Sequence, residues 1–412
     1  MNKAEILKTV TEKYLSSEEF NGQPISLFQK DKRALISLIR EGKIEINFGD
    51  NHPNPHIKAL KLDSKNTQIE KLSTLGLEQG CVYPTKKFLK TVVDSSKYNG
   101  KPFSLILALG EPQLNFAAFD LSILEYYRND PRYYYETDDV RGSISISDKY
   151  YRSMRFKPSD KVALQTFGFC YTKKFNRAVA VYYWYLSKLS PEHQQFWYSK
   201  ILHRKFWLHP DYARNTAGYF GEKESIFTAF IEELHTINEY SKLMEKPPLF
   251  KNTYENNKPK EFSFLVRPTS KEFNSFVHLL DIMLSDNINQ DFFQNDIAYT
   301  IERVRRDGRI IIENKGTITL LEDWLNSKIK FSDPKPKEEM LRVFRLIRKM
   351  RNRPAHNLDD NIFNQKYFKE QRRLIISAYG AIRTLRLILA NHPSAKNYKV
   401  PDWLFKGEIW NY

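Results

Sequence analysis

The stretch EEMLRVFRLIRKMRNRPAH, residues 338–356, decides how the C-terminal third of this chain folds. One side of a helix drawn at 100° per residue collects the apolar side chains of Val343, Phe344, Leu346, Ile347 and Met350. The opposite side is basic, and Pro354 must kink or end the helix because it has no backbone N–H to donate. The pattern predicts an amphipathic basic helix that is interrupted near residue 354.

Segments on both sides of this stretch also have helical spacing. Residues 270–288 and 317–329 repeat apolar side chains every three or four positions, and residues 363–392 do so for about thirty residues before Pro393. Four helices with short links predict an all-α bundle over residues 265–395. Residues 303–313 interrupt it with an Asp-Gly turn and are expected to form a small hairpin.

The first part of the chain mixes two kinds of pattern. Strands are expected at residues 43–49, 103–109 and 143–147. Helices are expected at residues 33–42, 84–94, 178–202 and 222–245. The sequence therefore predicts an α+β domain over residues 1–246, and leaves open whether that domain divides near residue 150. A proline- and asparagine-rich linker over residues 247–264 precedes the bundle, and residues 396–412 form a C-terminal tail.

Composition favours a cytoplasmic protein with no contact with a membrane. The 412 residues contain no run of about 20 apolar residues, which a membrane span would need, and the N-terminus lacks the apolar core of a signal peptide. Two cysteines far apart exclude a disulfide framework and a cysteine-based zinc site. No phosphate-binding loop, serine-hydrolase elbow or zinc-protease motif is present. We expect neither a metal nor a cofactor.

Charge points to a polyanionic partner. The formal net charge is +16, and residues 301–412 contribute +11 of it, from 24 Lys and Arg against 13 Asp and Glu. Such a field favours nucleic acid or nucleotide as a partner. The chemistry expected of residues 351–356, described below, narrows the expected partner to RNA, either tRNA or single-stranded RNA. The residues expected to hold the RNA backbone are Arg342, Arg345, Arg348, Lys349 and Arg353.

Residues 351–356 combine groups that suit phosphate chemistry. Arg351 falls at the edge of the apolar arc, and a half-buried guanidinium needs an anionic or hydrogen-bonding partner. A kink at Pro354 would bring Arg351, Asn352 and His356 to one point. There the imidazole could take a proton from a ribose 2′-hydroxyl while the guanidinium stabilises charge on the phosphate.

This motif, Arg351-Asn352-Arg353-Pro354-Ala355-His356, resembles the R-x4-6-H motif of the HEPN superfamily (higher eukaryotes and prokaryotes nucleotide-binding). The resemblance covers about residues 265–395. It implies a metal-independent endoribonuclease of a prokaryotic defence or toxin type, which leaves 2′,3′-cyclic phosphate ends. It also implies a homodimer in which Arg351 and His356 are catalytic and Asn352 supports them. Asp281 is the expected acidic partner on an earlier helix, and residues 1–246 would bind a regulatory ligand or protein.

The same residues are also compatible with two plainer roles. A HEPN-like bundle could bind RNA or nucleotide without cutting it, or the basic helix end could be an ordinary solvated surface. A second R-x4-H spacing, from Arg204 to His209, is interpreted as a helix end packed by aromatic residues. The carboxylates within residues 126–142 are interpreted as a solvent-exposed loop.

Overall fold

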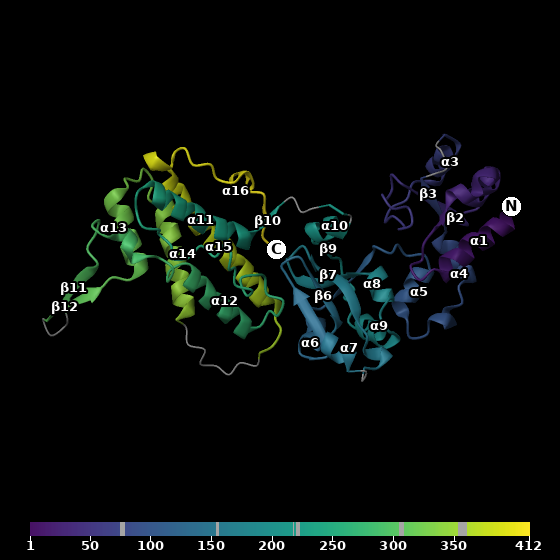
Figure 1. The fold of residues 1–412 in the computed structure, drawn as a ribbon, viewed down its shortest axis with the longest axis horizontal. Coiled ribbons are helices and arrows are strands. Elements are labelled where there is room, and N and C mark those ends of the chain that lie inside the picture. The colour runs from purple at the N-terminus through teal and green to yellow at the C-terminus, as the bar shows by residue number, and fades with distance from the viewer. Residues whose placement is uncertain (75–78, 154–155, 217, 220–222, 305–308, 353–360) are drawn as a thin grey trace. The chain divides into compact units, whose positions relative to one another are not determined.

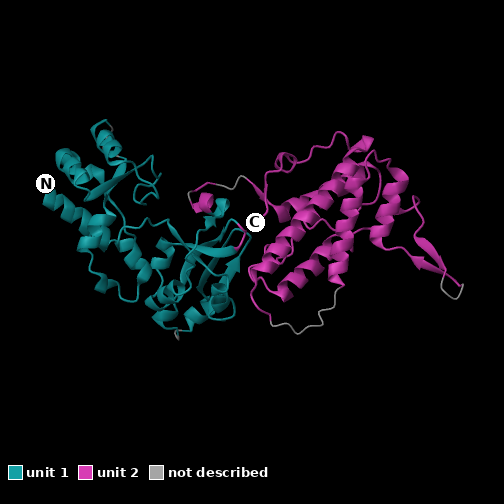
Figure 2. Cartoon of the chain, turned by 180° about the vertical axis from the view of Figure 1, so that it is seen from behind, with its two compact units in different colours: residues 1–173, 177–212 teal, residues 174–176, 213–412 magenta. Residues whose placement is uncertain are grey.

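The computed structural model describes residues 1–74, 79–153, 156–216, 218–219, 223–304, 309–352 and 361–412. Contacts divide the chain into two compact units, coloured separately in Figure 2. Unit 1 comprises residues 1–173 and 177–212, and unit 2 comprises residues 174–176 and 213–412. Unit 1 mixes sheets and helices and unit 2 is mostly helical (Figure 1), which confirms the mixed α+β class.

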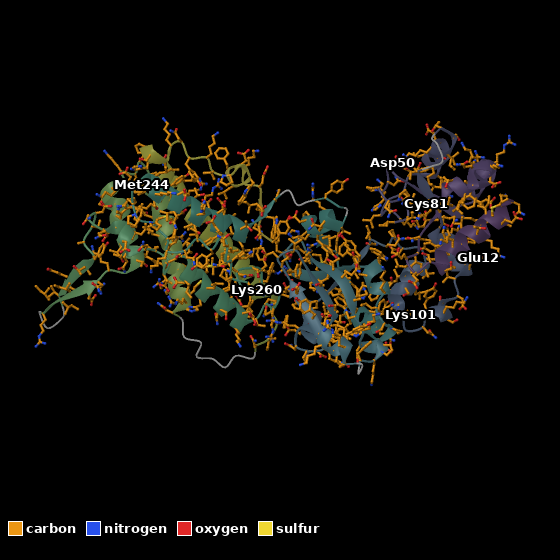
Figure 3. The ribbon with its side chains drawn as sticks, in the orientation of Figure 1. Glu12, Asp50, Cys81, Lys101, Met244 and Lys260 are labelled. Carbon is orange, nitrogen blue, oxygen red and sulfur yellow. The ribbon has the colours of Figure 1, made fainter. Side chains whose placement is uncertain are left out.

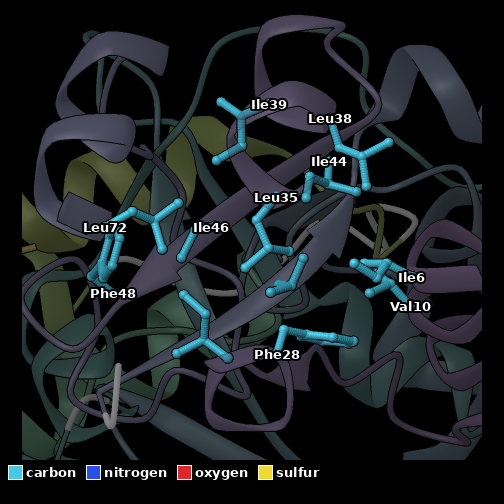
Figure 4. Packing of buried hydrophobic residues seen from close by; sticks show 12 residues of the cluster. Ile6, Val10, Phe28, Leu35, Leu38, Ile39, Ile44, Ile46, Phe48 and Leu72 are labelled. Carbon is cyan, nitrogen blue, oxygen red and sulfur yellow. The ribbon is translucent and has the colours of Figure 1, made fainter. Parts of the chain in front are cut away.

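The first sheet of unit 1 is small and antiparallel, in the order β1-β3-β2. Its strands are β1 (Gln23–Pro24), β2 (Ile44–Phe48) and β3 (Gly80–Pro84). Helices α1 (Lys3–Ser16) and α2 (Lys32–Arg40) contribute to its core, where Ile6, Leu35 and Ile46 are fully buried (Figure 4). The expected strand at 43–49 and helix at 33–42 are confirmed.

The second sheet of unit 1 is antiparallel, in the order β4-β8-β7-β6-β5, with β9 paired to β7. Its strands are β4 (Phe116–Phe119), β5 (Tyr133–Thr137), β6 (Arg141–Ile146), β7 (Ala163–Tyr171), β8 (Arg177–Tyr182) and β9 (Trp207–Leu208). The pairing of β6 with β7 spans residue 150, so the sheet gives no division of the chain there.

Short helices complete this part of the chain. They are α3 (Lys65–Thr74), α4 (Lys86–Val92), α5 (Pro102–Ala108), α6 (Ile123–Arg128), α7 (Asp148–Arg152), α8 (Tyr183–Ser187), α9 (Pro191–Tyr198) and α10 (Pro210–Thr216). The strand expected at 103–109 is wrong, because Pro102 starts helix α5 and the short apolar run is a buried helix. The helix expected over 178–202 is partly wrong. Its first residues belong to β8, which is buried on both faces and so shows no alternation.

The long helices of unit 2 are labelled in Figure 1. They are α11 (Ile226–Leu243), α12 (Ser270–Met283), α13 (Thr317–Lys328), α14 (Lys335–Arg351) and α15 (Gln365–Ala390). The expected helical segments are confirmed at their cores. One detail of the apolar arc is wrong: Leu346 is 45% exposed, while Met340 and Leu341 are buried.

Two strand pairs accompany the helices. The expected hairpin is confirmed by β11 (Thr300–Val304) and β12 (Ile310–Asn314), which pair in antiparallel register. In the C-terminal segment, helix α16 (Asp402–Lys406) is followed by β13 (Ile409–Trp410), which pairs in parallel with β10 (Glu224–Ser225). The segment predicted as a tail is therefore hydrogen-bonded to β10, which directly precedes α11.

The division between the units falls near residue 212, rather than at the segment 247–264 that was predicted as a linker. Helix α11 packs along α15, and Phe262 and Phe264 are buried against Phe227 of α11. Gln371 of α15 accepts a hydrogen bond from the N–H of Leu265 (2.9 Å) and donates one to the carbonyl of Ser263 (2.8 Å). Residues 247–264 are mostly polar, so the sequence pattern did not indicate that Phe262 and Phe264 are buried in unit 2.

Both cysteines are free thiols buried in strands. Cys81, labelled in Figure 3, lies in β3, and Cys170 lies in β7. Burial raises the pKa of Cys81 to about 12, so this thiol is protonated and unreactive at neutral pH. Among the residues that the structure describes, every helix is too short or too polar to cross a membrane.

Candidate functional site

The site is built where the last turns of α12 and α14 meet. Arg348 and Arg351 are three residues apart on α14, so they project from the same face of the helix. Asp281 lies in the last turn of α12, and Asp286 lies just beyond its end. Helices α12 and α14 pack against each other, which brings the two pairs together.

The two guanidinium groups and two carboxylates form one closed cluster. Arg348 donates from Nε to Asp281 (3.0 Å) and from Nη2 to Oδ1 of Asp286 (2.6 Å). Arg351 donates from Nη1 to Oδ2 of Asp281 (2.8 Å) and to Oδ2 of Asp286 (2.6 Å). Each acid thus contacts both arginines, and the cluster is formally neutral.

Burial distinguishes the two acids. The side chain of Asp281 is 0% exposed, while that of Asp286 is 38% exposed and those of the two arginines are about 30% exposed. A buried carboxylate must be paired with a cation, so Asp281 fixes where the guanidinium groups lie. The hydrogen bond to Asp281 raises the pKa of Arg351 above its ordinary value.

Two of the three predicted catalytic residues, Arg351 and Asn352, lie at the end of the same helix. Asn352 is exposed and caps α14, donating its backbone N–H to the carbonyl of Arg348 (3.2 Å). His356 and Arg353 lie outside the described residues. The structure therefore brings together Arg351 and Asp281 from the predicted set. The catalytic roles of Arg351, Asn352 and His356 and the supporting role of Asp281 remain predictions.

The residues predicted to hold RNA divide into two groups. Arg348 belongs to the cluster with Asp281 and Asp286, and Arg345 pairs with Glu322 of α13. Arg342 and Lys349 are exposed on the outer face of α14. Each of Arg345 and Arg348 therefore already has an intramolecular acid partner.

Sequence reasoning missed Asp286. It follows Asp281 by five residues and lies outside α12, so helical spacing does not connect it with the motif. One physical signal was available: carboxylates near the C-terminal end of a helix meet the negative end of its dipole and need a nearby cation. Asp281 and Asp286 both lie near that end of α12.

The two other candidate segments, both in unit 1, have structural roles. His209 is 0% exposed and its Nδ1 accepts the backbone N–H of Asp211 (3.2 Å) at the start of α10. Residues 126–142 form the end of α6 and the β5–β6 hairpin, where Arg132 pairs with Asp130 and Asp160. Within the described ranges, no group of three or more His, Cys, Asp or Glu is placed to hold a metal ion.

A second arginine–carboxylate pair lies in the core of unit 2. Arg386 of α15 donates from Nε to Glu233 of α11, and their side chains are 5% and 0% exposed. Burial raises the pKa of Glu233 above its ordinary value, and the adjacent guanidinium opposes that rise. This pair ties α11 to α15.

Comparisons of the chain with protein-family models, with curated proteins and with solved structures found no match.

Proposed function

We propose that the chain is a metal-independent endoribonuclease of the HEPN type, whose active site includes Arg351 and His356. The observation that carries this proposal is the position of Arg351 at the end of α14. The fully buried Asp281 of α12 binds its guanidinium, while the Arg351 side chain stays 30% exposed. A phosphate-binding arginine requires such exposure, because its guanidinium must meet an anion that arrives from solvent.

In this mechanism the histidine and arginine have separate tasks. His356 removes the proton of a ribose 2′-hydroxyl, whose oxygen attacks the adjacent phosphorus. Arg351 stabilises the negative charge that grows on the phosphate oxygens, and Asn352 orients the phosphate. The bond to the 5′-oxygen breaks, leaving a 2′,3′-cyclic phosphate on one product and a 5′-hydroxyl on the other. DNA lacks the attacking hydroxyl and is not a substrate.

The family resemblance extends the proposal to biology. A defence or toxin role, action as a homodimer and control by a ligand or protein bound to the N-terminal part all follow from the HEPN resemblance. The concentrated positive charge of residues 301–412 supports RNA as the partner.

The alternative function is an RNA- or nucleotide-binding module without catalysis. The observation in its favour is the net charge of +11 over residues 301–412, which suits binding of a polyanion whether or not that polyanion is cut.

The test is cleavage of mixed tRNA and single-stranded RNA by the wild type, His356→Ala and Arg351→Lys, with EDTA present. We expect the wild type to leave cyclic phosphate ends and His356→Ala to lose at least about a hundredfold in rate, as is typical of a lost acid–base group. Arg351→Lys keeps the charge but removes the planar fork, so its rate should also fall. RNA binding without cleavage by any variant would favour the non-catalytic module.

A further inference from the structure

We propose that Asp286 occupies the place of an RNA phosphate on Arg348 and Arg351, and that substrate binding displaces it. Asp286 would then be a built-in competitor that keeps the site closed until RNA arrives. The choice of RNA as the ligand rests on the proposed function. The contacts of Asp286 with the two arginines are independent of that function.

The contacts of Asp286 resemble those expected for a phosphodiester. Its two carboxylate oxygens are held by different arginines, Oδ1 by Arg348 and Oδ2 by Arg351, each at 2.6 Å. A phosphodiester also offers two non-bridging oxygens and one negative charge. Two guanidinium groups that already clamp one pair of anionic oxygens are arranged to clamp the other.

The two acids of the cluster are not equivalent. Asp281 is fully buried in α12 and cannot leave without exposing the helix interface. Asp286 follows the end of α12 and is 38% exposed, so its carboxylate can move into water. It is tethered mainly by its backbone, whose N–H bonds to the carbonyl of Asp281 (3.1 Å) and whose carbonyl accepts from Lys251 (3.0 Å).

Charge balance makes the exchange feasible. With both acids in place, the arginine pair presents no net charge. When a phosphodiester replaces the carboxylate of Asp286, both guanidinium groups keep their compensation, and Asp281 still anchors them from below. The cost of binding is the release of one half-exposed carboxylate to solvent, which is small compared with uncovering a buried charge.

The test compares Asp286→Asn with Asp291→Asn, both made in a His356→Ala chain so that the RNA stays intact. Asp291 is exposed in the short turn Gln290–Phe293 of the same unit, so the two variants change the net charge equally. The probe is fluorescently labelled decauridylate, titrated by anisotropy at several salt concentrations with EDTA present.

We expect Asp286→Asn to bind the probe about fivefold more tightly than Asp291→Asn at low salt, because the arginine pair gains a free positive charge. The slope of log affinity against log salt should steepen by about 0.7, the value for one further phosphate contact to a single strand. Equal affinities and slopes for the two variants would overturn the proposal.

A measurement on the His356→Ala chain alone guards against misfolding of the variant. Binding of decauridylate should shift the carboxyl carbon resonance of Asp286 in a chain with isotope-labelled aspartate side chains, since this carboxylate leaves Arg348 and Arg351. An unchanged resonance would contradict displacement. Tighter binding by Asp286→Asn with no cleavage by the wild type would keep this inference and reject the ribonuclease. Cleavage by the wild type with no effect of Asp286→Asn would do the reverse.

Discussion

Two arginine–carboxylate sites of unit 2 use the same chemistry in opposite ways. In the Glu233–Arg386 pair both side chains are at most 5% exposed, and each lies on a helix that crosses the core. In the Arg348–Arg351 cluster one acid is fully buried, but the two arginines stay about 30% exposed. The first site can bind nothing from solvent, while the second has a face open to water.

This difference distinguishes an ion pair that holds two helices together from one that can bind a ligand. A pair buried on both sides holds two helices in register, and removing one partner leaves an unpaired charge in the core. An arginine held by a buried acid and left partly exposed can meet an anion on its outer side, as Arg348 and Arg351 meet the half-exposed Asp286. Asp281 and Glu233 are equally buried, so the exposure of the arginine, and not that of the acid, distinguishes the two sites.

The largest expected effect is at the buried pair. Arg386→Ala should lower the free energy of unfolding by about 3–5 kcal/mol, because the buried Glu233 loses the guanidinium that offsets the cost of its burial. Urea denaturation of the full chain measures this. Arg373→Ala, on an exposed position of the same helix, is the matched control and should change stability by less than about 0.5 kcal/mol. Similar losses of unfolding free energy for both variants would mean that the Glu233–Arg386 pair does not hold the helices together.

An intermediate effect is expected at Asp296, whose side chain is 18% exposed. Burial alone would raise its pKa, but hydrogen bonds from Lys246, Lys328 and Trp324 outweigh burial and lower the pKa from 3.8 to about 2. Because the folded pKa lies below the ordinary value, the stabilisation is fully present above about pH 4 and is lost as the pH falls toward 2.

The contribution of Asp296 should be about 2 kcal/mol at neutral pH. Denaturation curves collected between pH 2 and pH 6 for the wild type and Asp296→Asn give the measurement. The wild type should lose stability more steeply below pH 4 than the variant does. Parallel pH profiles would mean that Asp296 is not held by these three donors.

The smallest effect on stability is expected at Arg345, whose side chain is 52% exposed and pairs with Glu322. Removing an exposed ion pair usually changes stability by no more than about 1 kcal/mol. Arg345→Ala should therefore melt close to the wild type, yet bind decauridylate more weakly at low salt if α14 carries RNA. A thermal melt and an anisotropy titration on one sample test both statements, and unchanged RNA affinity would remove Arg345 from the binding face.

The helices of unit 2 were predictable because periodic apolar residues mark one buried face. The errors arose where that marking fails. Residues 105–109 are apolar without interruption, so neither period is visible there, and β8 is buried on both faces. The membership of α11 in unit 2 depends on long-range packing against α15, which local pattern does not encode.

The site was predictable in part. The half-buried position of Arg351 followed from the helical wheel, and Asp281 followed from the HEPN resemblance. The second contact of each acid did not follow, since it depends on how α12 and α14 are aligned. Asp286 in particular lies in irregular chain, where spacing carries no information about direction.

The hydrogen bonds from Gln371 to residues 263 and 265 have a consequence for how this chain can be divided or recombined. A protease that cuts exposed, unanchored backbone should cut slowly around Phe262 and Phe264, because these residues are buried. A fragment that begins at residue 265 would lack α11, the buried Phe262 and Phe264, and Glu233, which pairs with Arg386. Helix α11 is therefore part of the helical unit, and the polar stretch before α12 is an internal segment of that unit and not a linker between two domains.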